Sequence, residues 1–278
     1  MSVDIDYLTR AYFYFDKPVN YKLDKGEILI RPVELQSSEI FLSSVGILNI
    51  DKNSIPNPQI IQMSYLQFLA EVVFHKDSPS LKTNLQQLLN IFILCLDLKA
   101  PMIKYNDFKK PYIYDELTGM SITPKQFDEI RQIILYQNIY NYDDSYVNPD
   151  LKKSMQEQDE LKNRNIETPN LERKIAIITA HSGLPKREQE LMTYRSHCVL
   201  FDEVCGEVEF TTVRPVALFS DGGKNLEHWI YKHKKDKFDG YIKSVDSYTN
   251  SMGGSQAMRT TDVSLGGSYM EQFNNFNK

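Results

Sequence analysis

The chain has 278 residues, of which 41% are hydrophobic, so it is long enough for one large domain or two modest ones with real cores. The formal net charge of -5 argues against a general nucleic-acid coat, which would be basic. The three cysteines, Cys95, Cys198 and Cys205, follow no disulfide-framework spacing, which excludes a disulfide scaffold and favours a reducing compartment. The acidic first ten residues do not have the pattern of a signal peptide. The longest apolar run, 91–96, is too short to cross a bilayer.

Residues 1–33 are predicted to form strands. Segment 11–15 is rich in aromatic residues and segment 27–33 is rich in β-prone ones, and Lys25-Gly26 predicts a turn between them. From Ser38 onward the apolar spacing changes to that of a helix, which is marked by Ile40, Phe41, Val45 and Leu48.

A small polar residue followed by proline recurs and predicts a series of helix starts, because the polar side chain caps and proline fixes the first-turn dihedral. The pairs are Asn57-Pro58, Ser78-Pro79, Thr123-Pro124, Asn148-Pro149 and Thr168-Pro169. The helices that follow Pro58 and Pro79 are apolar around much of their circumference and are predicted to form the core. Their apolar positions are Ile61, Tyr65, Phe68, Leu69, Val72 and Val73 in the first, and Leu81, Leu85, Leu88, Leu89, Phe92 and Leu96 in the second.

The stretch 123–164 organises the middle of the chain. A short hairpin turning near Thr118-Gly119 is predicted just before it. Gln126 completes a capping box with Thr123, and the apolar residues that follow lie on one helical face. An acidic, aromatic turn over 140–146 ends this helix, and a nearly all-polar helix begins at Asn148-Pro149.

The C-terminal part is predicted to be helical from Thr168, with the first helix ending at Gly183 because glycine suits a left-handed stop. Two more helices are predicted over 185–192 and 193–204. Segment 206–220 is ambiguous, since its β-branched residues favour a strand and Pro215 interrupts it. A last basic helix surrounds Trp229, and the Gly- and Ser-rich tail from Asn250 is predicted to be mobile.

These patterns predict a mainly α fold, with a helical bundle-like body and a small N-terminal β element. The predicted divisions are an N-terminal β-containing segment over 1–55, a helical core domain over 56–165, a C-terminal helical domain over 166–250 and a flexible tail over 251–278.

No catalytic, metal or cofactor site is predicted. His197, Cys198 and Cys205 do not follow zinc-finger or zinc-ribbon spacing. The turn at 143–150 lacks the glycine and the twelfth-position glutamate of an EF-hand, and the DGGK sequence over 221–224 lacks the spacing of a phosphate-binding loop. The protein is therefore not expected to be an enzyme.

A helix-turn-helix is the main rival interpretation of residues 171–204. Lys186 and Arg187 would face DNA in its short middle helix. Glu188 and Glu190 balance that charge, so phosphate affinity would be weak and nucleic acid is not the expected partner.

Residues 182–204 (SGLPKREQELMTYRSHCVLFDEV) resemble a segment that recurs in tail-assembly proteins of bacterial viruses. The matching positions are Gly183, Leu184, Glu188, Leu191, Met192, Thr193, Tyr194, Leu200 and Phe201. Residues 127–157 are similar to a segment of large-phage proteins from Gram-positive hosts, and 227–242 to the tryptophan-bearing C-terminal part of the same group. The resemblance covers about 85–250 and departs from the pattern at 206–220.

The resemblance implies a non-enzymatic helical chaperone or morphogenesis factor without a cofactor. It would bind phage tail proteins, such as the tape measure or baseplate subunits, in the host cell cytoplasm during assembly. A structural component of the tail or baseplate in the virion is one alternative, and a helix-turn-helix DNA-binding regulator is another. No membrane partner is expected, and a homo-oligomer is compatible with this interpretation.

Five residues are candidates for contact with a partner. Ile133, Ile134, Tyr136 and Tyr140 flank the polar helix and would line a groove for a helical client. Plain core packing is the favoured alternative for these four, because their spacing is that of a buried face. Trp229 would anchor the last basic helix.

Overall fold

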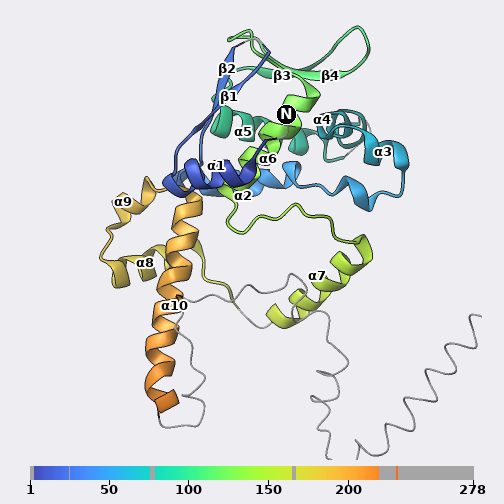
Figure 1. The fold of residues 1–278 in the computed structure, drawn as a ribbon. Coiled ribbons are helices and arrows are strands. Elements are labelled where there is room, and N and C mark those ends of the chain that lie inside the picture. Colours follow the sequence, from blue (N-terminus) through green and yellow to red (C-terminus); the bar gives the residue numbers. More distant parts are fainter. Residues whose placement is uncertain (1–2, 25, 76–78, 165–166, 219–229, 231–278) are drawn as a thin grey trace, which may run out of the picture. The chain divides into compact units, whose positions relative to one another are not determined.

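The computed structural model describes residues 3–24, 26–75, 79–164, 167–218 and 230. The described chain is mainly helical with two small antiparallel sheets (Figure 1), which confirms the predicted fold class. The chain divides into two compact units, one of Met1–Leu151 with Ile166–Trp229 and one of Lys152–Asn165 with Ile230–Lys278.

The α-helices are α1 (Ile5–Ala11), α2 (Ser38–Val45), α3 (Pro58–Gln62), α4 (Tyr65–Phe68), α5 (Leu81–Leu96), α6 (Pro124–Asn138), α7 (Pro149–Asn163), α8 (Leu171–Ser182), α9 (Lys186–Glu190) and α10 (Tyr194–Leu218). The strands are β1 (Val19–Lys22), β2 (Glu27–Ile30), β3 (Pro101–Tyr105), β4 (Pro111–Asp115) and β5 (Ser121–Ile122). The first two strands pair with each other, and the other three form a sheet in chain order.

The N-terminal strand prediction is wrong for residues 11–15. This segment holds the end of α1 and a 3-10 turn over Phe13–Phe15. The side chain of Asp4 caps α1 by accepting a hydrogen bond from the amide of Tyr7 at 2.9 Å, and aromatic content alone does not distinguish a helix from a strand. The pairing partner of β2 is β1, and Gly26 lies in the turn between them with φ at 95°.

Most of the predicted helix starts are confirmed, with shifts in their bounds. Asn57 caps α3, and Thr123 forms the predicted capping box with Gln126 at the start of α6. Asn170, rather than Thr168, caps α8 by accepting from the amide of Arg173. Ser78 lies outside the described residues, and α5 begins at Leu81.

The single long helix predicted after Pro58 is divided by Ser64. The hydroxyl of Ser64 accepts from the amide of Gln67 at 3.2 Å and starts α4. A π-helical turn over Leu69–Val73 follows α4. A serine that caps a new turn explains why the apolar period continues although the helix does not.

One hydrophobic core fills the first unit. Its buried residues run from Leu8 to Leu135, so they continue across the boundary predicted near residue 55. Helix α6 contacts α1, α4, β2 and α10 and contributes Phe127, Ile130 and Ile133 to this core.

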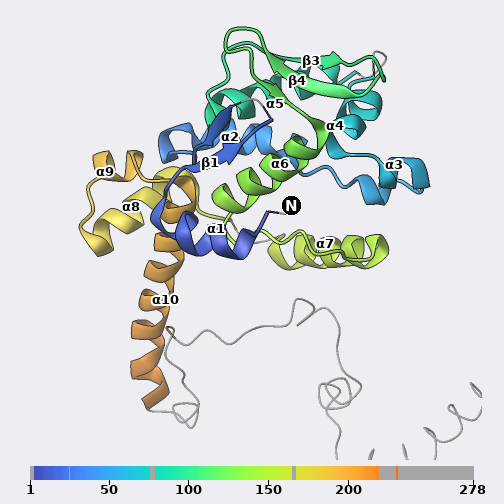
Figure 2. The ribbon, with the colours of Figure 1, turned by 45° about the horizontal axis from the view of Figure 1, so that its top comes forward.

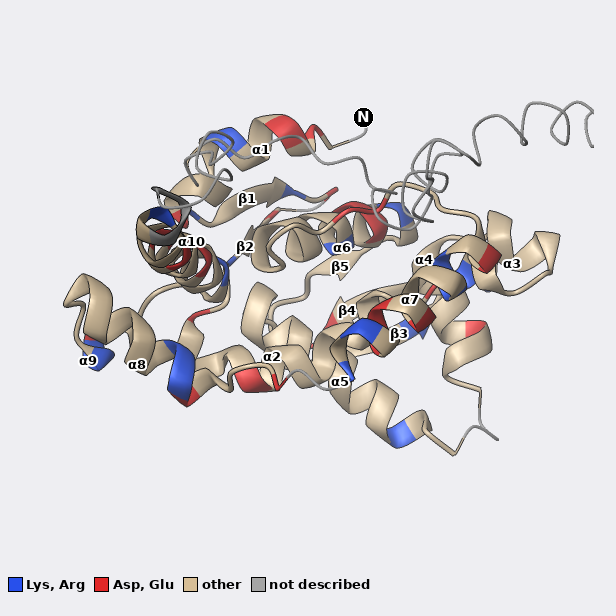
Figure 3. Ribbon diagram, turned by 90° about the horizontal axis from the view of Figure 1, so that it is seen from below, with Lys and Arg blue, Asp and Glu red and all other residues tan. Residues whose placement is uncertain are grey.

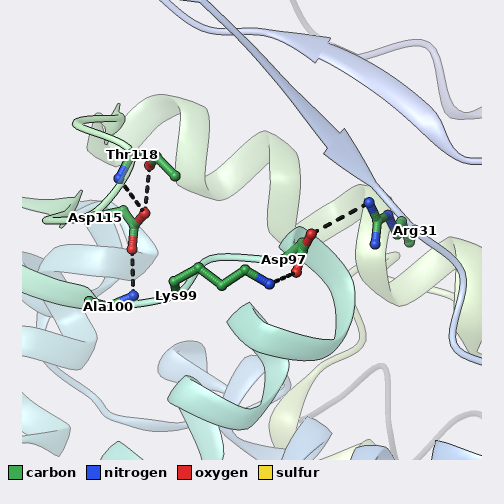
Figure 4. A network of polar contacts seen from close by, with 6 residues as sticks. All are labelled: Arg31, Asp97, Lys99, Ala100, Asp115 and Thr118. Carbon is green, nitrogen blue, oxygen red and sulfur yellow. Dashed lines mark hydrogen bonds and ion pairs between the residues drawn. The ribbon is translucent and has the colours of Figure 1, made fainter.

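The turn of the three-stranded sheet is fixed by the buried carboxylate of Asp115, which is 1% exposed. It accepts hydrogen bonds from the amide of Ala100 at 2.7 Å and from the amide and hydroxyl of Thr118 (Figure 4). Together with Gly119 at φ 70°, this confirms the hairpin that Thr118-Gly119 predicts. Asp97 ends α5 in the left-handed region and pairs with Arg31 and Lys99 (Figure 4).

The third C-terminal helix extends well beyond the predicted end. Helix α10 has 25 residues and continues through Pro215, so the ambiguous segment is helical as far as Leu218. Valine and threonine are only slightly weaker helix formers than the average residue, and a helix that has already started needs no new nucleus. The helix predicted around Trp229 and the tail predicted from Asn250 lie outside the described residues.

Candidate functional site

The structure places the predicted partner-binding residues in different environments. Ile133 and Ile134 are each 1% exposed and belong to the core, as the packing alternative predicts. Tyr136 and Tyr140 are half-buried. Trp229 lies outside the described residues. The first two residues therefore have no surface to offer to a partner.

Tyr136 is held in place by the acidic turn that follows α6. Its hydroxyl donates to Asp144 at 2.7 Å, and its ring meets that of Tyr142 edge to face at 4.9 Å. Burial, and then the hydrogen bond to Asp144, raise the pKa of Tyr136 to about 12. The carbonyl of Tyr136 accepts from Nη1 of Arg195 at 2.5 Å. This residue therefore joins α6 to the start of α10.

The start of α10 is fixed by contacts to segments far away in the sequence. The carboxylate of Asp16 accepts from the hydroxyl of Thr193 at 2.6 Å and from that of Ser196 at 2.8 Å. The amide of Tyr194 donates to the carbonyl of Val33 at 2.8 Å. Because these contacts hold both side chain and backbone, the direction in which α10 leaves the core is determined.

Helix α8 packs against the first half of α10. Nζ of Lys174 lies 5.4 Å from the centre of the Phe201 ring, and Val204 is only 5% exposed. At 1.5 Å per residue, the 12 residues of α8 span about 18 Å and the 25 of α10 about 37 Å. Helix α8 is therefore too short to cover the second half of α10.

The second half of α10 carries an exposed stripe of apolar and threonine side chains that we call the α10 seam. Val208, Thr211 and Pro215 continue the spacing of Phe201 and Val204, alternately three and four positions apart, as in the a and d positions of a coiled coil, and Thr212 lies next to Thr211, about one turn after Val208. The seam residues are Val208, Thr211, Thr212 and Pro215. Figures 1 and 2 show this half of the helix extending away from the body of the first unit.

The polar groups of the α10 seam are satisfied within the helix. The hydroxyl of Thr212 donates to the carbonyl of Val208 at 2.8 Å, and that of Thr211 donates to Glu207 at 2.9 Å. Threonine hydroxyls that bond back to the preceding turn need no partner from solvent. The stripe can therefore be covered by an apolar surface without leaving a buried hydroxyl unsatisfied.

Sequence reasoning missed the α10 seam although part of its signal is readable. Phe201, Val204 and Val208 already follow the three-four alternation. The β-branched residues beyond them and Pro215 favour a strand or a break in the helix, which hides the continuation of this spacing in the sequence.

His197 lies in the first turn of α10, and it is buried, with 1% exposure. Neither ring nitrogen has a hydrogen-bond partner among the described residues. Burial lowers the pKa of His197, and the charge of Lys174 lowers it further. The folded protein therefore favours the neutral form of this ring more than the unfolded chain does.

We expect the stability of the protein to fall as the pH drops from 7.5 to 5.5. The unfolded chain takes up a proton at His197 near the ordinary histidine pKa of about 6.5, while the folded chain takes it up only at a lower pH. The unfolded state then binds more protons, so the free energy of unfolding decreases as the pH falls through this range. Urea denaturation at both pH values measures the loss, and His197→Phe should reduce it. An equal pH dependence in the variant would contradict this assignment.

The described residues hold no group of three or more His, Cys, Asp or Glu side chains placed to bind a metal ion. Within the same residues, no helix is long and apolar enough to cross a membrane. The short middle helix of the helix-turn-helix alternative is the five-residue α9, in which Lys186 and Arg187 are followed by the exposed acids Glu188 and Glu190. Basic and acidic residues are mixed over the drawn elements, and none of these elements is basic throughout (Figure 3).

Comparisons with models of known protein families, with curated proteins and with solved structures found no match to this chain.

Proposed function

We propose that this protein is a non-enzymatic phage tail-assembly chaperone that binds a helical segment of another tail protein. The α10 seam is the observation that carries the proposal. It is a stripe of apolar and threonine side chains that no described residue covers, on a helix whose other end is fixed to the core. Such a stripe fits a second helix laid along it, with knobs from one helix entering holes in the other.

The energetics of α10 favour a partner for its second half. Helices gain most of their stability from packing an apolar face rather than from intrinsic propensity. Residues 207–213 include two valines and two threonines, which are weaker helix formers than alanine or leucine. A partner that covers Val208, which is 36% exposed, and Thr212 would supply the missing packing.

The resemblance of residues 127–157, 182–204 and 227–242 to phage tail-region proteins supports a tail protein as the partner. Residues 182–204 include the start of α10 and its packing against α8, so the matching segment contains the base from which the seam extends. The tape-measure chain is the preferred client, because the resemblance implies a long tape-measure chain as a frequent client and a helical segment fits the α10 seam.

Co-purification tests this function. The tagged protein is expressed together with the tail genes of its phage, and whatever remains bound through a high-salt wash is identified. We expect a long helical tail protein in the eluate and no copy of the chaperone in finished particles. A stoichiometric copy in finished particles would assign it instead to the tail or baseplate structure. Recovery of DNA alone, released by salt, would contradict both and favour the DNA-binding alternative.

A further inference from the structure

The first unit has a surface hollow of about 610 Å³ whose lining residues all lie between Lys52 and Asp128, and none of them belongs to α10. It is lined by residues of the turn before α3, the junction of α3 and α4, the start of β4 and the first turns of α6. The lining residues are Lys52, Gln62, Met63, Ser64, Gln67, Lys110, Thr123, Pro124, Lys125 and Asp128. Most are polar, and three are lysines from separate elements.

The walls of this hollow are held by specific hydrogen bonds. Nζ of Lys52 donates to the carbonyl of Met63 at 2.5 Å, and the carboxylate of Asp128 accepts from the amide of Tyr65 at 3.0 Å. The capping box of Thr123 and Gln126 fixes the first turn of α6. The hollow is therefore formed by anchored elements, which preorganises the groups that line it.

The charges that line the hollow are unbalanced. Three lysines and one aspartate line it, while the whole chain has a net charge of -5. Among the described residues, neither Lys110 nor Lys125 pairs with a carboxylate. The carboxylate of Asp128 is engaged by the backbone of α4, and burial raises its pKa. The hollow thus holds an excess of positive charge.

Helix α6 adds to this excess. It has 15 residues, no acidic residue in its first turn, and its N-terminal end lines the hollow through Thr123, Pro124 and Lys125. The N-terminal end of a helix carries a partial positive charge that favours anions. The dipole and the lysines act in the same direction.

We propose that this hollow binds a small anion that carries linked phosphate groups, such as pyrophosphate or the phosphate chain of a nucleotide. Lysine ammonium groups bind phosphate as point charges from several directions, which suits lysines from three elements. Gln62 and Ser64 line the same space and add neutral side chains that can form hydrogen bonds. A hollow of this volume lies in the range of small-ligand sites, so it also has room for a nucleoside.

Isothermal titration of the full-length protein with sodium pyrophosphate at low salt tests the proposal. We expect binding with a Kd below about 1 mM that weakens as salt is added. Lys125→Gln should weaken binding by about tenfold, because it removes an exposed ammonium from the rim of the hollow. Lys82→Gln, on the exposed face of α5, is the matched control and should leave the Kd unchanged.

Asp128→Asn gives the sharper test because its expected effect has the opposite sign. The asparagine oxygen still accepts from the amide of Tyr65, so the wall keeps its hydrogen bond while the only lining carboxylate is removed. We expect pyrophosphate to bind at least about threefold more tightly. A thermal melt of each variant confirms that it remains folded.

Parallel titrations with ATP and adenosine distinguish a nucleotide from free pyrophosphate as the ligand. Adenosine, which has no phosphate group, measures what the nucleoside contributes alone. Tighter binding of ATP than of pyrophosphate assigns the hollow to a nucleotide, and equal binding assigns it to the free phosphate chain. Absence of pyrophosphate and ATP binding at about 10 mM, or equal affinities for wild type, Lys125→Gln and Asp128→Asn, would overturn the proposal.

Discussion

Phe127→Ala is expected to lower the free energy of unfolding by about 3–5 kcal/mol. The ring of Phe127 is 1% exposed. It lies between the ring of Tyr65, stacked at 6.5 Å, and that of Phe92, edge-on at 6.1 Å. Removing it leaves a cavity where α6 meets α4 and α5, and the neighbouring rings lose their contacts. Urea denaturation followed by circular dichroism measures the loss.

Two further substitutions make this test specific. Phe127→Leu keeps most of the volume and should cost less than the alanine variant. Phe108→Ala removes the same side chain from a position that is 83% exposed, so stability should change by less than about 0.5 kcal/mol. Similar losses from Phe127→Ala and Phe108→Ala would contradict the placement of α6 at the centre of the core.

Asp16→Ala is expected to lower the free energy of unfolding by about 2–3 kcal/mol, because it removes a charged acceptor from two hydroxyls. Thr193 and Ser196 both donate to this carboxylate. Asp16 also has φ at 55°, which alanine adopts less readily than aspartate or asparagine. The loss should be concentrated in α10, where amide hydrogen exchange is expected to become faster.

Asp16→Asn separates the two causes. Asparagine tolerates the left-handed conformation and keeps one acceptor oxygen. The loss in free energy of unfolding should therefore be about half of that expected for Asp16→Ala. A double-mutant cycle of Asp16→Ala with Thr193→Val measures the contact itself and should give a coupling of about 1 kcal/mol or more. Additive effects in this cycle would show that the carboxylate does not hold the start of α10.

Local signals in the sequence were sufficient for much of the fold. The Thr123-Gln126 capping box, the Asn57 cap and the stop at Gly183 each depend on residues within one or two turns, and such contacts are readable without knowing the rest of the chain. The strand prediction for 11–15 is wrong because it relied on aromatic content, which does not distinguish a strand from the end of α1 and the 3-10 turn that follow one another there.

The proposed binding surfaces are less predictable from the sequence, because they depend on which faces the described residues leave exposed. Ile133 and Ile134 have the spacing of an amphipathic face, but that face packs into the core. The exposure of Val208 follows from the difference in length between α8 and α10, which the sequence does not show directly. Lys52, Lys110 and Lys125 are far apart in the sequence, and only the tertiary structure brings them to one hollow.

The most direct test of the proposed function compares two valines of the same helix. Val208 lies in the α10 seam, and Val213 lies on another face with a similar exposure of 42%. Each is changed to glutamate, and the amount of tail protein that co-purifies is measured after circular dichroism has confirmed equal helix content. We predict that Val208→Glu reduces recovery by about tenfold or more, whereas Val213→Glu retains it. Equal recovery with both variants would contradict the assignment of the α10 seam as the binding surface.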